Sequence, residues 1–273
     1  TRPRCPTTWT SASCAARAEA TVRTVVLCGG FGTRIRDVAD DVPKPMVRIG
    51  GTPILEHLLD WYARHGHDEF VLCLGYKGDA IVAHFGARPG RTTGGSGTWT
   101  HEGTIGGRDC RVVMVDTGLQ ALTGARIRRV REHVGDATFM LTYGDGLSDV
   151  DLGALTAHHR ARGKALTVTG VRPPSRFGEL QVDDGGDVTG FNEKSQASGG
   201  RISGGFFVCE PRVFEYLDDR EDLMWEKEPI QAIVKDHDMT MYAHDGFWQC
   251  MDTYREWQLL NELWDAGDAP WAR

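Results

Sequence analysis

The sequence lacks the marks of several protein classes. Its seven cysteines form no CxxC pair and no cysteine–histidine cluster at metal-ligand spacing. No apolar run approaches the roughly 18 residues that a membrane-spanning helix needs. The formal charge of −7 argues against an evenly basic nucleic-acid-binding protein. We therefore expect a reduced, cytoplasmic protein that binds neither membranes nor nucleic acids.

The composition is that of a globular chain with a workable core. Of the 273 residues, 40% are hydrophobic and 25% are charged. The first 23 residues contain four arginines and no long apolar centre, so they are not a secretory signal, although their alanines, serines and threonines also suit a transit peptide. We expect residues 1–23 to be a disordered extension. No linker or repeat divides residues 24–273, which we expect to form one domain.

Short apolar runs and amphipathic segments alternate along the first two thirds of the chain. Buried strands are predicted at 24–28, 70–74, 112–115, 138–142 and 165–171. Helices are predicted at 53–66, 78–85, 125–133 and 151–162, the first of them with Thr52 as N-cap and Pro53 at the first helical position. Such alternation predicts an α/β fold with a mostly parallel sheet between helices, whose ligands bind at the carboxyl ends of the strands.

The second half of the chain follows a different pattern. A hairpin is predicted with strands 180–182 and 188–191, then a strand at 204–208 and helices at 211–217, 229–235 and 253–264. Between residues 86 and 107, eight of 22 residues are glycine, a composition that predicts a mobile loop rather than a packed element.

A glycine-rich turn, GGFGTR at 29–34, directly follows the first strand. Backbone N–H groups can converge on a phosphate at such a strand end, and glycine permits the close approach. The turn lacks the Gly-Lys-Ser/Thr of a P-loop, and Ile35 leaves the dinucleotide fingerprint incomplete. Further along, Lys44 stands between two prolines. Fixed cations such as Arg34 and Lys44 around a glycine turn suit a triphosphate.

The pattern GGFGTR at 29–34 followed by PKP at 43–45 resembles the signature of the sugar-1-phosphate nucleotidylyltransferases. Later segments are most similar to the members of that family that transfer a cytidylyl group to glucose 1-phosphate. These segments are LGYKG (74–78), VDTG (115–118), LTYGDG (141–146), RFG (176–178), FNEK (191–194), GGFFV (204–208), WEKEP (225–229) and GFWQCMDT (246–253). The resemblance implies a Rossmann-like nucleotidyltransferase domain with a smaller sugar-binding hairpin and C-terminal helices.

The same resemblance implies a reaction. The phosphate oxygen of α-D-glucose 1-phosphate would attack the α-phosphorus of CTP, giving CDP-glucose and pyrophosphate. Positioning and charge stabilisation dominate transfers of this kind. A nucleotidyl transfer needs a divalent ion, and Mg²⁺ takes one or two carboxylates and several waters. Asp145 directly follows a predicted buried strand. Taken alone, an aspartate between glycines more often serves simply to form a turn. By resemblance, Asp145 and Asp252 are the Mg²⁺ ligands.

Resemblance also assigns the nucleotide-binding residues. Arg34 would hold the β- and γ-phosphates, and Lys44 the α- and β-phosphates. The base would lie near residues 27–29, 75–77 and 117–126, although an arginine at position 126 is solvent-facing by default. The full nucleotide-binding set is Leu27, Gly29, Gly30, Gly32, Thr33, Arg34, Lys44, Gly124, Arg126 and Asp145.

For the sugar phosphate, the family's FNEK motif implies that Lys194 grips the phosphate and that Glu193 binds sugar hydroxyls. Gly178 would lie against the sugar, where a side chain would clash. Ser203 and Gly204 would complete this pocket, but the family usually has asparagine where this chain has Ser203. The shorter hydroxyl can bond a sugar oxygen only at closer range or through water, so sugar specificity is open.

Other assignments remain open. Trp225 and Glu226 are candidates for the sugar pocket or for packing. A thymidylyl- or uridylyltransferase would differ only in the base pocket. A metal-dependent glycosyltransferase is suggested by the Asp-x-Asp of Asp149 and Asp151, although these also fit the N-cap region of a helix. A non-catalytic sugar-nucleotide sensor is a third alternative. The family suggests a homo-oligomer, and the tryptophans of the C-terminal 30 residues could pack a core or an interface.

Overall fold

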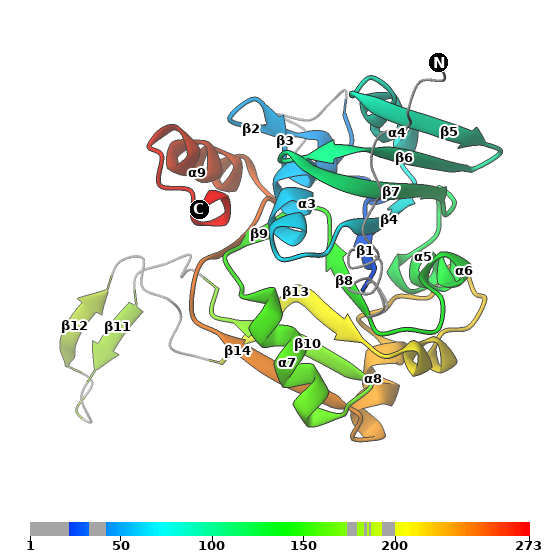
Figure 1. The fold of residues 1–273 in the computed structure, drawn as a ribbon. Coiled ribbons are helices and arrows are strands. Elements are labelled where there is room, and N and C mark those ends of the chain that lie inside the picture. The colour runs from blue at the N-terminus through cyan, green and yellow to red at the C-terminus, as the bar shows by residue number, and fades with distance from the viewer. Residues whose placement is uncertain (1–21, 33–41, 174–178, 183–184, 186, 193–199) are drawn as a thin grey trace, which may run out of the picture.

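The computed structural model describes residues 22–32, 42–173, 179–182, 185, 187–192 and 200–273 (Figure 1). Of the expected N-terminal extension, only Val22 and Arg23 belong to this described part. Among the described residues, no helix is both long and apolar enough to cross a membrane.

A nine-stranded mixed sheet forms the centre of the molecule, in the order β14-β10-β13-β8-β1-β4-β7-β6-β5. Only β13 and β6 run against the other seven strands, so the prediction of a mostly parallel sheet is confirmed. The strands are β1 (Thr24–Leu27), β4 (Glu69–Leu74), β5 (Gly90–Gly95), β6 (Thr98–Ile105), β7 (Arg108–Asp116), β8 (Phe139–Tyr143), β10 (Leu166–Val171), β13 (Ile202–Cys209) and β14 (Met239–His244).

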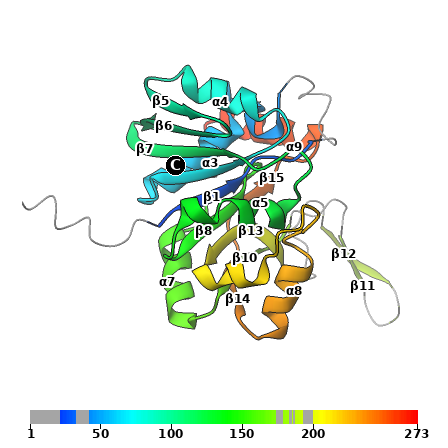
Figure 2. The ribbon, with the colours of Figure 1, turned by 90° about the vertical axis from the view of Figure 1, so that its right-hand side faces the viewer.

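Helices cover both faces of this sheet (Figure 2). Because side chains alternate along a strand, Val26 of β1 packs in one apolar cluster and its neighbour Val25 packs in the other. The first cluster includes residues of α3 (Ile54–Arg64), α4 (Gly78–Gly86), α7 (Leu152–Arg162) and α9 (Tyr254–Asp265). The second includes residues of α5 (Thr123–Arg129), α6 (Arg131–Val134), α8 (Glu228–Lys235) and the 3₁₀ helix η3 (Pro211–Tyr216).

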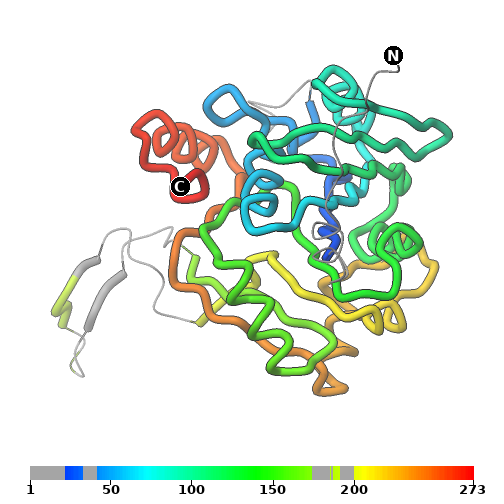
Figure 3. The backbone as a smooth tube through the Cα atoms, in the orientation of Figure 1, coloured from blue at the N-terminus to red at the C-terminus, as the bar shows by residue number. Residues whose placement is uncertain are grey.

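Segments from the end of the chain lie beside segments from its middle. β14 pairs in parallel with β10, and β15 (Trp248–Cys250) pairs with β9 (Gly146–Ser148). Figure 3 shows the orange chain of β14 following the green chain of β10. The predicted hairpin is confirmed as β11 (Glu179–Val182) and β12 (Val188–Asn192), and Figures 1 and 2 show it standing away from the sheet.

The predicted loop at 86–107 is wrong, because most of these residues form β5 and β6 at one edge of the sheet. The glycines of β5 allow its backbone to lie close to that of β6. A Cβ on Gly94, at φ +123°, would lie 2.3 Å from the carbonyl oxygen of Thr98. The sequence analysis overlooked β6 as a strand. In β6 the side chains of His101 and Ile105 are buried, and the residues between them are more exposed.

Two predicted helices also differ from the structure, one in where it begins and one in its type. Thr52 and Pro53 form the short strand β3 (Thr52–Pro53), paired with β2 (Arg48–Ile49), rather than the N-cap and first turn of α3. The N–H of Ile54 donates to the carbonyl of Val47, which satisfies the helix N-terminus through the backbone. The helix predicted at 211–217 is the 3₁₀ helix η3.

Candidate active site

A cavity of about 450 Å³ lies beyond the carboxyl ends of β1, β7 and β8, at the edge of the sheet where ligands were expected. Segments following each of these strands line it. It brings together eight residues that the sequence proposed, namely Leu27, Gly29, Gly30, Gly32, Lys44, Arg126, Asp145 and Asp252.

Asp145 and Asp252 are brought together by a short antiparallel ladder. Gly146 of β9 is opposite Cys250 of β15, and the N–H of Met251 donates to the carbonyl of Asp145 at 2.9 Å. Each aspartate therefore lies just beyond one end of this ladder. The register of β9 and β15 makes two carboxylates that are distant in sequence into neighbours.

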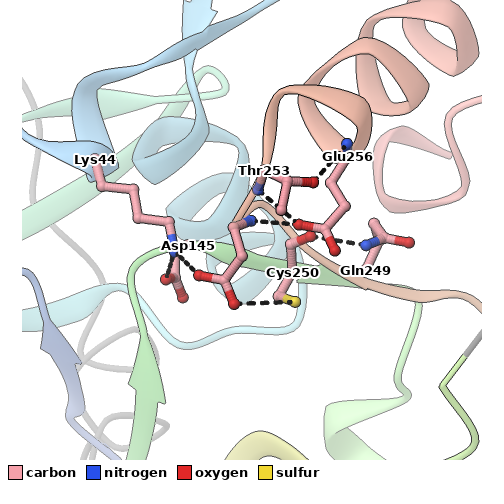
Figure 4. A network of polar contacts seen from close by, with 7 residues as sticks. Lys44, Asp145, Gln249, Cys250, Thr253 and Glu256 are labelled. Atoms are coloured by element: carbon pink, nitrogen blue, oxygen red, sulfur yellow. Dashed lines mark hydrogen bonds and ion pairs between the residues drawn. The ribbon is translucent and has the colours of Figure 1, made fainter. Parts of the chain in front are cut away.

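Lys44 connects the two carboxylates. Its Nζ lies 2.5 Å from Asp145 Oδ2 and 2.5 Å from Asp252 Oδ1. Figure 4 shows the side chain extending from its short 3₁₀ helix, η2 (Lys44–Met46), to Asp145. Burial alone would lower the pKa of Lys44, but the two carboxylates outweigh it and raise that pKa above its usual value. The ammonium is therefore charged at neutral pH.

The start of α9 holds Asp252 in place. Glu256 Oε2 accepts hydrogen bonds from the N–H groups of Asp252, at 2.6 Å, and Thr253, at 2.8 Å (Figure 4). Thr253 is the N-cap, and its hydroxyl accepts from the N–H of Glu256, so the two residues form a capping box. The predicted start of this helix at Thr253 is thus confirmed, and it fixes the backbone next to a functional carboxylate.

The capping box predicts a moderate loss of stability. Replacing Thr253 with Ala should lower the free energy of unfolding by about 1 kcal/mol, because the first turn of α9 loses a cap. Urea denaturation monitored by circular dichroism measures the change. Thr98→Ala, at the partly buried start of β6, is the control without a capping bond. Equal effects of the two substitutions would mean that the cap contributes nothing specific.

Arg126 lies beneath the glycine turn. Its guanidinium is buried, with the side chain donating to the carbonyls of Gly29, Leu74 and Leu119 and to the hydroxyl of Thr117. The default expectation of a solvent-facing arginine is therefore wrong. These acceptors follow or end β1, β4 and β7, so one cation joins three strand ends. Burial lowers the pKa of Arg126.

Close contact with Arg126 explains the first glycine of the turn. A Cβ on Gly29 would lie 2.3 Å from the guanidinium carbon of Arg126. Gly32 has φ +60°, a left-handed conformation that favours glycine. Phe31 at the rim of the turn is about half exposed, and its ring centroid lies 5.2 Å from that of Tyr76. Because its glycines have no side chains, the turn forms a side of the cavity where a ligand can come close to the backbone.

A second wall of the cavity is made by the residues at the start of α5, which the segment before α8 supports from behind. The N–H groups of Gly124 and Ala125 donate to the carbonyl of Leu223, so the N-terminus of α5 is already satisfied by protein. Gly124 itself does not line the cavity but packs against Leu223. Glu226 accepts hydrogen bonds from the hydroxyls of Thr123 and Tyr143, both of which line the cavity.

The tryptophan at 225 is fully buried and packs in the core, near Phe207. Its neighbour Glu226 is the member of this pair that reaches the cavity wall. Gln120 and Leu122, which lie in the range 117–126 predicted to be near the base, also line the cavity, and so does Tyr143, which the sequence analysis did not single out. Tyr143 was within reach of sequence reasoning, because it directly precedes the Gly-Asp-Gly turn.

The sugar-side candidates are only partly described. Ser203 and Gly204 lie in β13, where Ser203 is exposed and Trp248 Nε1 donates to the carbonyl of Gly204 at 2.7 Å. A Cβ on the next residue, Gly205, would lie 2.5 Å from the ring of Tyr143, so this end of β13 lies beside the cavity wall. The remaining candidates lie outside the described residues: Thr33, Arg34, Gly178, Glu193 and Lys194.

The alternative Asp-x-Asp feature has a structural explanation. Asp151 is the N-cap of α7, and its side chain accepts from the N–H of Ala154. Asp149 pairs with His244, with Oδ1 3.0 Å from Nε2. Neither aspartate lines the cavity. The helix-capping interpretation of this motif is therefore the one that agrees with the structure.

The donor set at Asp145 and Asp252 suits a divalent ion that keeps most of its own waters. Among the described residues, no group of three or more His, Cys, Asp or Glu side chains could hold a metal ion. Two carboxylate oxygens nevertheless lie within 2.5 Å of one cation, the ammonium of Lys44. Two carboxylates with water and phosphate oxygens are the ligands typical of Mg²⁺.

Comparisons with known proteins agree with this geometry. The model of the nucleotidyl transferase family matches residues 23–253. A probable glucose-1-phosphate cytidylyltransferase of Bacillus subtilis (strain 168) is 41% identical over 253 residues, covering 92% of this chain and 99% of the relative. The glucose-1-phosphate cytidylyltransferase of Salmonella typhi is 39% identical over 257 residues, covering 92% and 98%.

Solved structures support the fold. The crystal structure of HddC from Yersinia pseudotuberculosis matches with a TM-score of 0.66 at 20% identity, covering 89% of this chain and 99% of that one. A similar match, with a TM-score of 0.65 at 15% identity, is the UTP-bound UGPase from Acinetobacter baumannii. The Rossmann-like α/β architecture predicted from the sequence is thus confirmed. The family match over most of the chain and the two relatives near 40% identity show that this chain belongs to the nucleotidyl transferase family.

Proposed function

We propose that this chain is a glucose-1-phosphate cytidylyltransferase, which joins CTP and α-D-glucose 1-phosphate to give CDP-glucose and pyrophosphate. The observation that carries the proposal is the meeting of Asp145, Asp252 and Lys44 at a cavity floored by the glycine turn. The two relatives that bear this enzyme's name match almost the whole length of both chains.

Asp145 and Asp252 would hold Mg²⁺. When bound, the ion would neutralise charge on the α-phosphate during the transfer. The capping box of Thr253 and Glu256 supports this role, because it fixes the backbone of one proposed ligand. The carbonyl of Asp145 accepts from Met251, which fixes the backbone of the other.

The protein would contribute binding and orientation. The backbone from Gly29 to Gly32 would contact the triphosphate, and Lys44 would hold its α- and β-phosphates with a charged ammonium. Arg34 would hold the β- and γ-phosphates. Because attack is in line, the hexose phosphate oxygen must lie opposite the departing pyrophosphate, and fixed cations on both groups supply that alignment.

On the sugar side, Lys194 would bind the phosphate of the hexose 1-phosphate, and Glu193 its hydroxyls. Gly178, Ser203 and Gly204 would line the sugar. The exposed Ser203 is next to Gly204, whose carbonyl is held by Trp248, so its hydroxyl is available to a ligand. The closeness of Gly205 to Tyr143 supports a sugar site continuous with the nucleotide cavity.

The base would lie over Gly29 and beside residues 119–126. Arg126 would position the base site indirectly, because its hydrogen bonds hold the backbone at Gly29 and Leu119. Gly124 would contribute through its contact with Leu223 rather than by direct contact with the base.

The proposal further includes a single domain from residue 24 to 273 and a homo-oligomer that acts in the cytoplasm, where its soluble substrates occur.

Pyrophosphate release tests the proposed function. With Mg²⁺ and glucose 1-phosphate, CTP should be used at least roughly tenfold better, in kcat/KM, than dTTP, UTP, ATP or GTP, since one good base contact is worth about 1–3 kcal/mol. Faster release with dTTP or UTP would retain the fold and metal assignments but reject the base. No release with any nucleotide, using glucose, galactose or mannose 1-phosphate, would favour a sugar-nucleotide sensor.

A further inference from the structure

Lys44 occupies the point where a metal ion held by Asp145 and Asp252 would have to bind. One atom, Nζ, contacts Oδ2 of Asp145 and Oδ1 of Asp252. The lysine side chain is only 12% exposed, whereas the two aspartate side chains are 29% and 22% exposed. The ammonium therefore lies behind carboxylates that solvent can reach. An ion that bridged these two oxygens would need the position that the ammonium occupies.

The two oxygens of Asp252 have different contacts. Its Oδ2 lies 3.9 Å from the Sγ of Cys250, while Oδ1 is the atom held by Lys44 (Figure 4). Its N–H is fixed by Glu256 at 2.6 Å. A cation that bound Oδ1 of Asp252 together with Oδ2 of Asp145 would therefore take the place of the Lys44 ammonium.

The Lys44 side chain can move while its backbone stays in place. The N–H of Met46 donates to the carbonyl of Pro43 at 2.8 Å, and the neighbouring Pro45 and Met46 are buried. A Cβ on Gly32 would lie 3.3 Å from the Cβ of Lys44, so the lysine stem starts beside the glycine turn. Its flexible four-carbon chain lets the ammonium reach either the carboxylates or a phosphate over that turn.

Charge balance decides whether the ammonium of Lys44 lies at the two carboxylates or at a phosphate over the glycine turn. Two carboxylates favour a cation strongly, and the ammonium supplies it until a divalent ion replaces it. The displaced ammonium would then repel the ion unless it found another anion. A nucleoside triphosphate on the glycine turn offers that anion.

We propose that Lys44 is an exchangeable counter-ion for the carboxylate pair, so that a divalent ion enters readily only when a nucleotide draws the ammonium away. The inference rests on the proposed function, in which the two aspartates are the metal ligands. It makes metal and nucleotide binding favour each other, and such coupling is reciprocal. The protein alone would bind the divalent ion weakly.

Binding of Mn²⁺ without nucleotide tests this inference. Electron paramagnetic resonance measures free Mn²⁺ in the presence of wild-type protein and of Lys44→Met, which keeps the length of the side chain and removes its charge. The variant should bind Mn²⁺ about tenfold more tightly or better, because a competing cation is gone. Lys44→Arg should bind as weakly as wild type. Adding Asp252→Asn to Lys44→Met should abolish the gain.

Lys77→Met is the control for loss of a nearby positive charge. Its Nζ lies 5.5 Å from the ring centroid of Tyr76, whose N–H donates to the carbonyl of Gly29. Lys77→Met should leave Mn²⁺ affinity within about twofold of wild type, because its ammonium lies over the ring of Tyr76 and does not take the bridging position of Lys44. An equal gain in Lys44→Met and Lys77→Met would overturn the inference, because general charge rather than exchange would explain it.

Failure of the inference can be told apart from failure of the proposed function. If Lys44→Met binds Mn²⁺ no better than wild type, while Asp252→Asn abolishes metal-dependent pyrophosphate release, only the counter-ion role is overturned. If Asp252→Asn leaves that release intact, the metal assignment fails and the inference fails with it. Should Lys44→Met be unstable alone, Mn²⁺ must raise its melting temperature more than that of wild type. No such difference would also overturn the inference.

Discussion

Replacing Asp252 with Asn is expected to lower kcat for pyrophosphate release by about a thousandfold or more. The substitution keeps the size of the side chain and its place before α9, but removes one of two charges proposed to hold the metal ion. Loss of a group that stabilises transition-state charge in a preorganised site costs about 10²–10³ in rate, and a metal ligand should lie at or above the upper end. Steady-state kinetics at saturating CTP and Mg²⁺ measure the change.

A matched control lies on the same helix. Asp265→Asn removes the same charge at the last residue of α9, where the side chain is exposed, and kcat should remain within about twofold of wild type, since exposed charges contribute little. Circular dichroism should show that both variants are folded. A kcat for Asp252→Asn within about threefold of wild type would contradict the metal assignment.

Replacing Arg126 with Met is expected to lower the free energy of unfolding by about 3–5 kcal/mol. The guanidinium is buried and hydrogen-bonded at 2.7 Å to the carbonyl of Leu74 and at 2.8 Å to the hydroxyl of Thr117, among other acceptors. Removing it leaves several buried acceptors without partners, each costing about 1–3 kcal/mol before the structure relaxes. Urea denaturation monitored by fluorescence measures the loss.

Arg128 provides the comparison for this arginine. It belongs to the same helix, but its partner Asp219 is exposed, with Nε and Oδ1 3.2 Å apart. Arg128→Met should cost about 1 kcal/mol or less, as surface ion pairs do. If Arg126→Met were no more destabilising than Arg128→Met, the hydrogen bonds beneath the glycine turn would contribute little to stability, and Arg126 would need another role.

Several elements followed from local patterns. The run from Thr24 to Leu27 consists of β-branched or apolar residues, which fits a strand buried on both faces, and β1 lies in the middle of the sheet. The helix predicted at 253–264 is confirmed as α9, and the residues that cap it, Thr253 and Glu256, are only three positions apart. These predictions succeeded because a few adjacent residues supply all the interactions that decide them.

The edge strands show where local patterns failed. Glycine content alone made residues 86–107 a loop, yet β6 pairs along its whole length with β7. Pairing with a neighbouring strand offset the low strand preference of glycine. Similarly, Thr52 has a side chain suited to capping, but pairing of β3 with β2 places it in a strand.

The sequence by itself determined the α/β class, the glycine turn after the first strand, and the lysine between two prolines. These features depend on residues that are adjacent in the chain, whose backbone preferences act within a few bonds. Only the tertiary structure decided that Asp145 and Asp252 share the ammonium of Lys44 and that Arg126 is buried beneath three strand ends. Such contacts join segments far apart in sequence, so they depend on strand register and on the packing of the whole domain.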